Sequence, residues 1–586
     1  MGGRIGRAMA VLAALLLVTT GVQACGRSSD SAEQAAGSGD GEFQQLASEI
    51  LEFTYESDPS NATYLGIHKY DSKIRDYSAA GIASDVETIK GFRTRLDAVD
   101  AGALSDEAQL DLEQTRHTLD GMLLRDEVIR PWAKDPDSYS SGITNDAYVI
   151  ISRSFAPPED RLTSLIARLK AMPDALAQAR KNLDNPPRIY TEIAIEQIDG
   201  NRAFFEEDVP AAFTDVKDAA LLAEFTSARD AVIAALTEYG DWLRSDLLNR
   251  SNGSFALGES TYRKVLDADE MITTPLPDLL AVAEEDLRKN QQEFTEAARQ
   301  IDPTKSPADV FADLTKDHPP ASELLAVTQG NLDGLARFVA DKQIIDVPEA
   351  PPATVKETPP FMRATTSAAM DTPGPFETVA TEAYFFMTLP DPSWPKEEQD
   401  DFMSQWYRPS ISNVSVHEVW PGHYVQFLYA KDYPSDVRKV FGAASNFEGW
   451  AHYCEQMMLD EGLHADDPRY RLAEVQDALL RDVRFIVGIK MHTQGMTVEQ
   501  AQTMFEKDAY QPAPVAESEA KRGTSDATYG YYTMGKLMIL KLRSDYRAKM
   551  GDSYSLKKFH DEFIRLGPLP LPLVRKAMLG EVGDPF

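Results

Sequence analysis

Residues 277–300, PDLLAVAEEDLRKNQQEFTEAARQ, carry apolar residues three and four positions apart, with charged residues between them. This spacing places the apolar side chains on one face of an α-helix. Residues 160–185 and 221–249 repeat the pattern. These stretches predict that the chain from about residue 43 to residue 345 is a helical N-terminal lobe, whose helices pack through their apolar faces.

The composition changes after this lobe, because residues 346–409 hold 11 of the 35 prolines. Helix interiors do not accommodate proline, so this segment must run extended or in turns. Residues 376–379 and 383–389 are rich in β-favouring side chains and predict a small sheet. Helical periodicity resumes at residue 411. The predicted fold is mostly α, a large helical body with a small strand region lining a deep active-site cleft, and residues 346–586 form the catalytic lobe.

The charge balance excludes one class of partner. The 586 residues include 59 Lys and Arg against 93 Asp and Glu, a net charge of −34. A surface of this sign repels phosphate backbones and anionic lipids. We therefore expect no nucleic-acid partner.

Residues 1–24 have the layout of an export signal. Arg4 and Arg7 precede an apolar run that is too short to span a bilayer comfortably, and Cys25 follows the expected cleavage site directly. We therefore expect an exported chain whose mature form begins at Cys25. Lipidation of Cys25 would leave Cys454 as the only free thiol, so no disulfide is expected to support the fold.

The three residues before Cys25, Val22-Gln23-Ala24, resemble the lipobox of bacterial lipoproteins, in which the cysteine is acylated. The resemblance implies a lipid anchor on Cys25, for example palmitate, and a flexible tether over residues 25–42. The protein would then face outside the cytoplasm and touch the cell membrane only through this anchor. The alternative is ordinary signal cleavage next to an incidental cysteine.

Two of the nine histidines, His417 and His423, lie in one short segment, VHEVWPGHYVQ at residues 416–426. Zinc peptidases of the His-Glu-x-x-His type need two imidazole ligands on one helix face. They also need a glutamate beside the first histidine, which takes a proton from the attacking water. Glu418 follows His417 in this order, so the segment is a candidate metal site.

The spacing of the two histidines departs from that pattern, because they are six residues apart instead of four. On a regular helix this separates the two side chains by roughly 120°. Pro421 cannot donate a hydrogen bond to the carbonyl of His417, and Gly422 follows it. We therefore expect the helix to bulge or restart between the histidines.

A candidate third ligand, Glu448, lies 25 residues beyond His423, in the segment NFEGWAHYCE at residues 446–455. Zinc peptidases whose third ligand is a glutamate use a spacing of this size. Glu448, His452 and Glu455 fall on one helix face, so His452 or Glu455 could join the site. The alternative is a helix-surface ion pair between His452 and a glutamate.

The motif His-Glu-x-x-Pro-Gly-His-x-x-Gln at residues 417–426, followed by Glu-Gly-Trp-Ala at residues 448–451, resembles the bacterial domain-of-unknown-function family DUF885. Residues 59–68 and 566–571 also look like that family. The motif is distantly similar to the zinc peptidases of the angiotensin-converting-enzyme and oligopeptidase group. The resemblance therefore implies a peptidase-like metal site.

By this resemblance, His417, His423 and Glu448 bind one zinc ion per chain and Glu418 is the general base. Two positions depart from the family, where apolar or small residues are usual: they are His452 and Cys454. The departure leaves open whether His452 is an additional ligand. Nucleophilic catalysis by Cys454 with His452 is disfavoured, because neighbours in sequence point in different directions on a helix.

The Tyr-x-x-Gly block from Tyr532 to Gly535 resembles another part of the family pattern. A phenol aimed at the oxyanion that develops during peptide hydrolysis stabilises the transition state. Tyr532 is therefore the predicted second catalytic residue. The alternative is that Tyr529, Tyr531 and Tyr532 only pack the start of a helix.

Two further residues are candidates for substrate binding. Arg522 could bind a substrate C-terminal carboxylate through its two-pronged guanidinium, or it could pair with Glu519 on its own helix. His492 also fits the family pattern. A packing role in the core, or support of a ligand, is the alternative for His492.

These observations predict a lipid-anchored, exported zinc metallopeptidase that hydrolyses short peptides. Carboxypeptidase, dipeptidyl-carboxypeptidase and oligopeptidase activities all fit the pattern. The strand at residues 383–389 is expected to pair with an extended peptide. One alternative is a non-catalytic metal- or peptide-binding lipoprotein, although such proteins usually alternate strands and helices and have no use for Glu418. The other is a metal-dependent hydrolase of a non-peptide bond.

Overall fold

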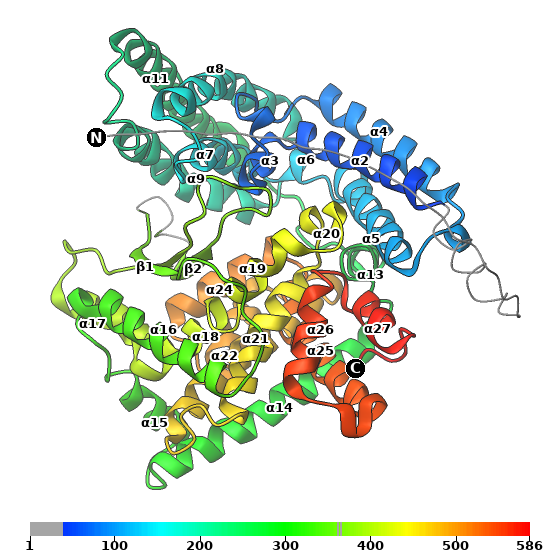
Figure 1. The fold of residues 1–586 in the computed structure, drawn as a ribbon. Helices are drawn as coiled ribbons and strands as arrows, with labels where there is room; N and C mark the ends of the chain where they lie inside the picture. The colour runs from blue at the N-terminus through cyan, green and yellow to red at the C-terminus, as the bar shows by residue number, and fades with distance from the viewer. Residues whose placement is uncertain (1–38, 360–362, 364–365) are drawn as a thin grey trace, which may run out of the picture.

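The computed structural model of the chain describes residues 39–359, 363 and 366–586. The predicted signal at residues 1–24 and the lipidation site Cys25 lie outside the described residues, as does most of the tether predicted for residues 25–42. The described chain is mostly helical and contains one small sheet (Figure 1). The predicted mostly-α fold class is therefore confirmed.

The helices that precede the sheet lie in two parts of Figure 1: those labelled up to α11 form its upper part, and α14, α15 and α16 lie at the bottom and left of its lower part. They are α2 (Asp40–Ser57), α3 (Pro59–Leu65), α4 (Ala79–Asp97), α5 (Asp106–Leu123), α6 (Pro131–Lys134), α7 (Asp137–Ile151), α8 (Pro158–Asn182), α9 (Arg188–Ala203), α10 (Val209–Ala211), α11 (Ala219–Trp242), α12 (Leu248–Arg250), α13 (Glu259–Glu270), α14 (Leu276–Ile301), α15 (Pro307–Leu314) and α16 (Leu324–Asp341).

The three stretches with the clearest periodicity are helices, as predicted: they are α8, α11 and α14. The side chain of Ser306 accepts a hydrogen bond from the backbone N of Asp309, and Pro307 occupies the first turn of α15. This cap satisfies a backbone donor that has no partner within the helix. Local sequence patterns therefore account for these helices.

The sheet has the strand order β1–β3–β2. Its strands are β1 (Thr354–Glu357), β2 (Ala368–Asp371) and β3 (Tyr384–Met387). β1 pairs parallel to β3, and β2 pairs antiparallel to β3. The strand predicted at residues 383–389 is therefore present as β3, but it lies in the centre of the sheet, where both of its edges are already paired.

The strand predicted at residues 376–379 is wrong, because this segment is a turn. The Oε1 atom of Glu377 accepts hydrogen bonds from the backbone N atoms of Val379, at 2.6 Å, and of Ala380, at 3.2 Å. A side chain that takes up two successive backbone donors favours a turn over a strand. β-favouring side chains alone could not reveal this local competition.

The helices that follow the sheet carry the predicted metal site. They are α17 (Lys396–Met403), α18 (Arg408–Glu418), α19 (His423–Leu428), α20 (Asp436–Val440), α21 (Ala444–Asp460), α22 (Pro468–Thr493), α23 (Val498–Asp508), α24 (Ala513–Ser525), α25 (Tyr531–Met550), α26 (Leu556–Arg565) and α27 (Leu571–Leu579).

The largest hydrophobic cluster joins α13, α14, α15 and α16 to α18, α19 and the helices from α21 onward. The helices α7 to α11 form a second cluster, and α2 to α5 form a third cluster that also contacts α20. The change of composition after residue 345 therefore marks a change of local structure. It does not divide the core there, because α13–α16 pack with the C-terminal helices.

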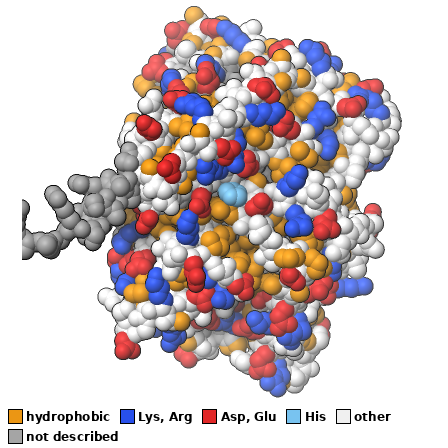
Figure 2. Space-filling view, turned by 90° about the vertical axis from the view of Figure 1, so that its right-hand side faces the viewer, with side chains coloured by type: hydrophobic (Ala, Val, Ile, Leu, Met, Phe, Trp, Pro, Cys, Tyr) orange, Lys and Arg blue, Asp and Glu red, His pale blue; other side chains and the backbone are white. Residues whose placement is uncertain are grey.

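The face of the molecule in Figure 2 carries acidic and basic side chains that are interspersed. The excess of acidic residues is thus not gathered into one patch on this face. Among the residues that the structure describes, no helix combines enough length and enough apolar character to cross a bilayer.

Glu270, at the end of α13, is a buried carboxyl that accepts hydrogen bonds from the backbone N and the hydroxyl of Ser445, in the first turn of α21. Burial raises the pKa of Glu270 to about 7, although these hydrogen bonds oppose the rise. The unfolded chain releases this proton near pH 4.5, whereas the folded protein keeps it up to about pH 7. The contribution of Glu270 to the free energy of unfolding is therefore lost as the pH rises through this window.

We expect the melting temperature to fall less between about pH 5 and pH 8 in Glu270→Gln than in the wild type. The contribution removed from the pH dependence is on the order of 3 kcal/mol. Thermal denaturation across this pH range measures it. Glu259→Gln, at the exposed start of the same helix, is the matched control and should keep the wild-type slope. An unchanged slope in Glu270→Gln would contradict the assignment.

Candidate metal centre

The helix that carries His417 ends and a new helix begins before His423. α18 stops at Glu418, and α19 starts at His423. Between them the backbone N of Gly422 donates to the carbonyl O of Val416 at 3.1 Å, which folds the chain back over the end of α18. The predicted restart at Pro421 and Gly422 is confirmed, and it removes the angular mismatch of the six-residue spacing.

Gly422 is required at this turn because its backbone lies against the end of α18. A Cβ atom at this position would lie 1.7 Å from the carbonyl O of His417, far inside van der Waals contact. The turn is also held from α21, since the indole Nε1 of Trp450 donates to the carbonyl O of Pro421 at 2.9 Å. The Pro-Gly pair of the motif therefore shapes the site and does not merely interrupt a helix.

Glu448, in α21, meets both histidines. Its Oε2 atom lies 3.3 Å from His417 Nε2 and 3.2 Å from His423 Nε2. Among the described residues, these three are the group of metal-ligating side chains whose ligand atoms converge, all within 4.8 Å of one another. The structure thus brings together the three predicted ligands from three different helices.

The donor set fits zinc. Two imidazole nitrogens and one carboxylate oxygen are a ligand set that zinc peptidases use. Ligands held at about 2.0 Å from a tetrahedral ion stand roughly 3.3 Å apart, close to the two distances from Glu448. In addition, among the described residues no hydrogen bond satisfies the buried Oε2 atom of Glu448. His417, His423 and Glu448 are therefore suited to hold a zinc ion.

A second carboxylate orients His417 from behind. Glu455 lies on α21, seven residues beyond Glu448, and is buried. Its Oε1 atom lies 2.6 Å from His417 Nδ1. Arg481, in α22, donates to Glu455 Oε2 at 3.0 Å, and Asn413, in α18, donates to the same oxygen at 2.9 Å. A carboxylate on the far nitrogen of a ligating histidine sets its tautomer and its orientation. Glu455 is therefore a support of the site and not one of its converging ligands.

Charge pairing overcomes the cost of burying these groups. Burial opposes the ionisation of Glu448, but the nearby His423 and His417 hold its pKa well below the usual range. Burial also opposes the ionisation of Glu455, whose pKa Arg481 and the nearby histidines hold well below the usual range. These pairings favour the ionised form of both carboxylates.

A sequence profile described as "Bacterial protein of unknown function (DUF885)" matches residues 59–578 of the chain. The chain belongs to the DUF885 family. This confirms the family that the motif resembles. The matched range contains all three converging side chains and nearly all of the described fold.

Two solved structures are similar to this DUF885 protein over nearly its whole length. One, described as a candidate lipoprotein of unknown function from Shewanella oneidensis, is 26% identical with a TM-score of 0.77, and the match covers 92% of this chain and 99% of that chain. The other, described as a candidate lipoprotein from Colwellia psychrerythraea, is 16% identical with a TM-score of 0.79, covers 93% of this chain and 99% of that chain, and shows the fold alone. No curated protein matches the chain.

Glu418 directly follows the candidate ligand His417 in sequence, and its side chain contacts the sheet. Its Oε2 atom accepts a hydrogen bond from the backbone N of Met370, in β2, at 2.9 Å. β2 is an edge strand, and Met370 therefore turns its backbone N away from β3 and toward Glu418. The residue predicted to be the general base is thus held beside the free edge of the sheet.

Tyr532 reaches the cluster because α21 and α25 cross closely. Gly449 and Gly535 meet at the crossing, where a Cβ atom on Gly449 would lie 2.5 Å from the Cα of Gly535. This contact explains the glycine that follows Glu448 and the glycine of the Tyr-x-x-Gly block. The ring of Tyr532 lies with its centroid 6.3 Å from that of His417.

The neighbouring tyrosines have different surroundings. Tyr529 is fully buried and packs against Gly523, whereas the hydroxyl of Tyr531 donates to Asp526 at 3.3 Å. Burial raises the pKa of the Tyr532 phenol, and the Glu448 carboxylate adds to the rise. Among the three tyrosines, Tyr532 is the one whose ring contacts a candidate ligand.

Arg522 lies near Tyr531 but is already paired. Its Nη2 atom donates to Asp526 Oδ2 at 2.9 Å. The predicted alternative partner, Glu519, instead accepts two hydrogen bonds from Arg484, at 2.6 and 2.7 Å. The alternative pairing of Arg522 with Glu519 is therefore wrong, because Glu519 pairs with Arg484 on the facing helix α22. Binding of a substrate carboxylate by Arg522 stays a prediction.

His492 has a packing role in the structure. It is buried, and its Nε2 atom donates to the carbonyl O of Gly523 at 2.8 Å. Its ring packs against Phe255 and Tyr262. These contacts separate it from the converging ligands, so they do not support the predicted role in substrate binding. The family-like histidine at position 492 thus contributes to the contact between α22 and α24.

His452 and Cys454 do not belong to the converging group. His452 is fully buried on α21, and its Nδ1 atom lies 3.5 Å from Glu455 Oε2. Burial holds the pKa of His452 well below its usual value, so it is neutral. Burial also raises the pKa of the Cys454 thiol well above its usual value, which disfavours a nucleophilic thiolate.

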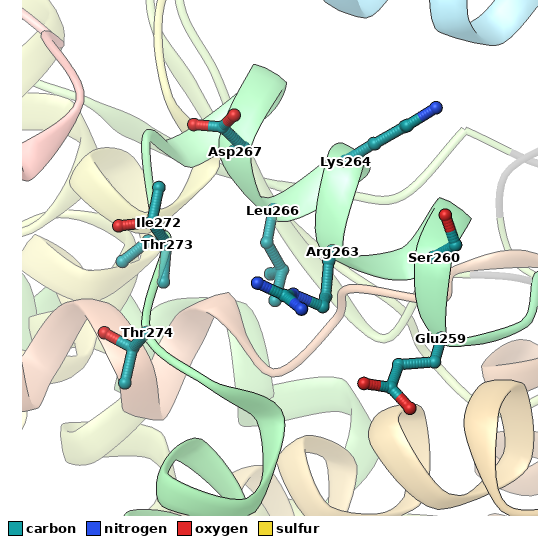
Figure 3. Close-up of a pocket in the computed structure, with 9 residues that line it drawn as sticks. All are labelled: Glu259, Ser260, Arg263, Lys264, Leu266, Asp267, Ile272, Thr273 and Thr274. Carbon is teal, nitrogen blue, oxygen red and sulfur yellow. The ribbon is translucent and has the colours of Figure 1, made fainter.

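A hollow of about 470 Å³ lies along α13 (Figure 3). None of its lining residues, which come from α13 and from the segment directly after it, belongs to the metal cluster. They are Glu259, Ser260, Arg263, Lys264, Leu266, Asp267, Ile272, Thr273 and Thr274. Its lining lacks converging ligands, so it does not compete with the cluster as a metal site.

We expect Gly422→Ala to reduce zinc binding strongly, although no ligand is replaced. The added methyl group must displace the end of α18 and hence His417, and crowding of this kind typically costs about 1 to 3 kcal/mol of stability. Elemental analysis and thermal denaturation measure the two effects. Gly330→Ala, in α16, is the control, because nothing lies within 4 Å of its added Cβ. A Gly422→Ala protein with normal zinc content and melting temperature would contradict this account.

Proposed function

We propose that the protein is a zinc metallopeptidase that hydrolyses short peptides. The observation that carries the proposal is the convergence of His417, His423 and Glu448, together with Glu418, which follows His417 in sequence and contacts the edge strand β2. A bound zinc ion would act as a Lewis acid and make water a stronger nucleophile. Simple metal storage gives no reason for a carboxylate held beside the ligands.

In this proposal different side chains move the proton, stabilise the developing charge and hold a ligand in place. Glu418 accepts a proton from the attacking water and later returns it to the leaving amine. Tyr532 donates a hydrogen bond to the oxyanion that develops on the scissile carbonyl. Glu455 and Arg481 keep the His417 ring in place throughout.

The free edge of β2 supports a peptide as the substrate. Ala368 and Met370 direct their backbone groups away from β3, because the residues between and beyond them pair with it. An extended peptide can add to such an edge through main-chain hydrogen bonds. This revises the sequence-based expectation, in which residues 383–389 pair with the substrate, since β3 has no free edge.

We further propose that the protein is lipid-anchored through Cys25 and faces outside the cytoplasm. The lipobox-like residues before Cys25 support this, and so do the descriptions of the two similar structures as candidate lipoproteins. The anchor would be the only contact with the membrane. Cleavage without lipidation is the alternative.

The direct test is peptide hydrolysis by the purified protein, with and without a chelator, against a library of short peptides. We expect turnover that the chelator abolishes and added zinc restores. Hydrolysis of esters or non-peptide amides with no peptide turnover would favour the other hydrolase class. Tight peptide or metal binding without any turnover would favour a binding lipoprotein.

Replacing Tyr532 with phenylalanine tests the oxyanion donor. We expect kcat to fall roughly 10² to 10³-fold, because one donor to the oxyanion is lost while the ring and its packing remain. KM, zinc content and melting temperature should change little. Tyr531→Phe is the matched control and should be milder. If Tyr531→Phe shows the large loss instead, the assignment of Tyr532 is mistaken.

A further inference from the structure

The ring of Tyr532 lies against two arginines of α22. The guanidinium carbon Cζ of Arg484 is 5.2 Å from the centroid of the ring, and that of Arg481 is 5.6 Å from it. The side chains of both arginines are largely buried, with 11% of Arg484 and 12% of Arg481 exposed. Cations bind favourably to the faces of aromatic rings, and the attraction is stronger where water is excluded. The contact with α22 therefore favours one place for the ring.

Arg484 is itself fixed by α24. Its Nε and Nη2 atoms donate to the two carboxylate oxygens of Glu519, at 2.7 and 2.6 Å. A two-pronged pair of this kind fixes the plane of the guanidinium as well as its position. Burial opposes the ionisation of Glu519, but Arg484 holds the pKa of this carboxyl below its ordinary value. The charged pair is thus a fixed support beside the Tyr532 ring.

The backbone that carries Tyr532 is tied to the same helix. A Cβ atom on Gly530, directly before α25, would lie 2.7 Å from the Cα of Phe485, so these two backbones are in direct contact. The hydroxyl of Thr533 donates to Asp482 Oδ1 at 2.9 Å, and both side chains are fully buried. The start of α25 is therefore held against α22 at positions next to the two arginines. The side-chain torsions of Tyr532 are what remains to be set.

We propose that Arg484 is a positioning residue that keeps the phenol of Tyr532 aimed at the oxyanion. This inference rests on the proposed function, in which Tyr532 is the oxyanion donor. Arg481, one turn earlier, holds His417 through Glu455. α22 then sets the positions of a ligand and of the oxyanion donor together. The orientation of the donor matters, because a misplacement of about 1 Å can cost roughly 10²-fold in rate.

A double-mutant cycle on kcat tests this role. Arg484→Met keeps an unbranched side chain but removes the charge and the donors to Glu519. We expect it to lower kcat roughly 10- to 100-fold, with KM and zinc content unchanged. In a Tyr532→Phe background the same substitution should lower kcat less than about 3-fold, because the hydroxyl that it misplaces is already gone. Arg484→Lys keeps a charge beside the ring and should recover part of the loss.

The matched control is Arg547→Met. Arg547 lies over the ring of Tyr554, with its Cζ 5.6 Å from the centroid, but it is exposed and lies in the last turn of α25. The control therefore removes an arginine from a tyrosine ring far along the helix from Tyr532. It should keep the wild-type kcat.

A second variant guards against a folding defect. Arg484→Met leaves the largely buried Glu519 carboxylate without its partner, which can destabilise the fold. Adding Glu519→Gln removes both charges of the pair. The combined variant should show the same loss of kcat, at a melting temperature closer to that of the wild type.

A further readout does not need turnover. In protein whose tyrosines carry ¹³C at Cζ, the NMR signal of Tyr532 is the one that Tyr532→Phe removes. We expect this signal to be single and narrow in the zinc-loaded wild type. Arg484→Met should broaden or split it, because the ring is no longer held in one orientation, whereas Arg547→Met should leave it unchanged.

The outcomes for Arg484→Met separate positioning from a general structural role. An equal loss of kcat in the wild-type and Tyr532→Phe backgrounds would overturn the proposal. An unchanged kcat, or a Tyr532 signal that stays single and narrow, would also overturn it. If the wild type hydrolyses no peptide, the proposed function fails, and the NMR signal alone then decides whether Arg484 holds the ring.

Discussion

The protein is expected to hold about one zinc ion per chain, and replacing His417 or His423 with alanine is expected to abolish this binding. Each histidine supplies one of three converging ligand atoms, and the remaining two cannot hold the ion in a closed site. Elemental analysis of the purified variants measures the loss. His117→Ala is the control, because His117 lies on α5, outside the cluster, and should leave the zinc content unchanged.

The same series should separate ligands from their supports. Glu455→Gln is expected to retain zinc but to weaken its affinity roughly 10- to 100-fold, as for other carboxylates behind a ligating histidine. The chelated wild type should also melt at a lower temperature, because zinc binds the folded chain only. A full zinc content in both histidine variants would refute the metal centre.

Glu418→Gln is expected to keep the zinc and to lose turnover by roughly 10² to 10⁴-fold, the usual contribution of a general base. The glutamine still presents an oxygen to the backbone N of Met370, so the hydrogen bond to β2 can persist. It cannot take up a proton from water. Steady-state hydrolysis together with elemental analysis separates the chemical effect from metal loss.

The contrasting outcomes for Glu418→Gln are informative. Normal turnover would refute the assignment of Glu418 as base. Loss of zinc would instead indicate that Glu418 is itself a ligand. Glu461→Gln, at the C-terminal end of α21, removes a charge without touching the cluster and should match the wild type in both measurements.

The helical body could be predicted because the buried face of a helix shows in the spacing of apolar residues along a single stretch of sequence. In residues 277–300 the apolar side chains recur with the helical period, and α14 spans Leu276–Ile301. The arrangement of the sheet is harder to predict from sequence, because a short apolar run does not show which strands pair with it. Thus β3 was predicted but its central place was not, and β1 and β2 have no comparable apolar run.

The ligands of the candidate metal centre could also be predicted, because His417, Glu418 and His423 stand together in sequence and Glu448 follows at a recognisable spacing. The support of the site could not. Arg481 comes from α22 and reaches Glu455 only through helix packing. A helix face shared by Glu448 and Glu455 was the single sequence signal for that support.

The sequence by itself therefore determined the helical class, the three candidate ligand residues and the break between His417 and His423, since each follows from a local pattern or a short sequence motif. Only the tertiary structure decided that Glu455 lies behind His417 and that β2, rather than β3, offers its edge to Glu418. These depend on which distant segments come into contact. A local pattern does not encode those contacts, because many packing partners satisfy the same apolar face.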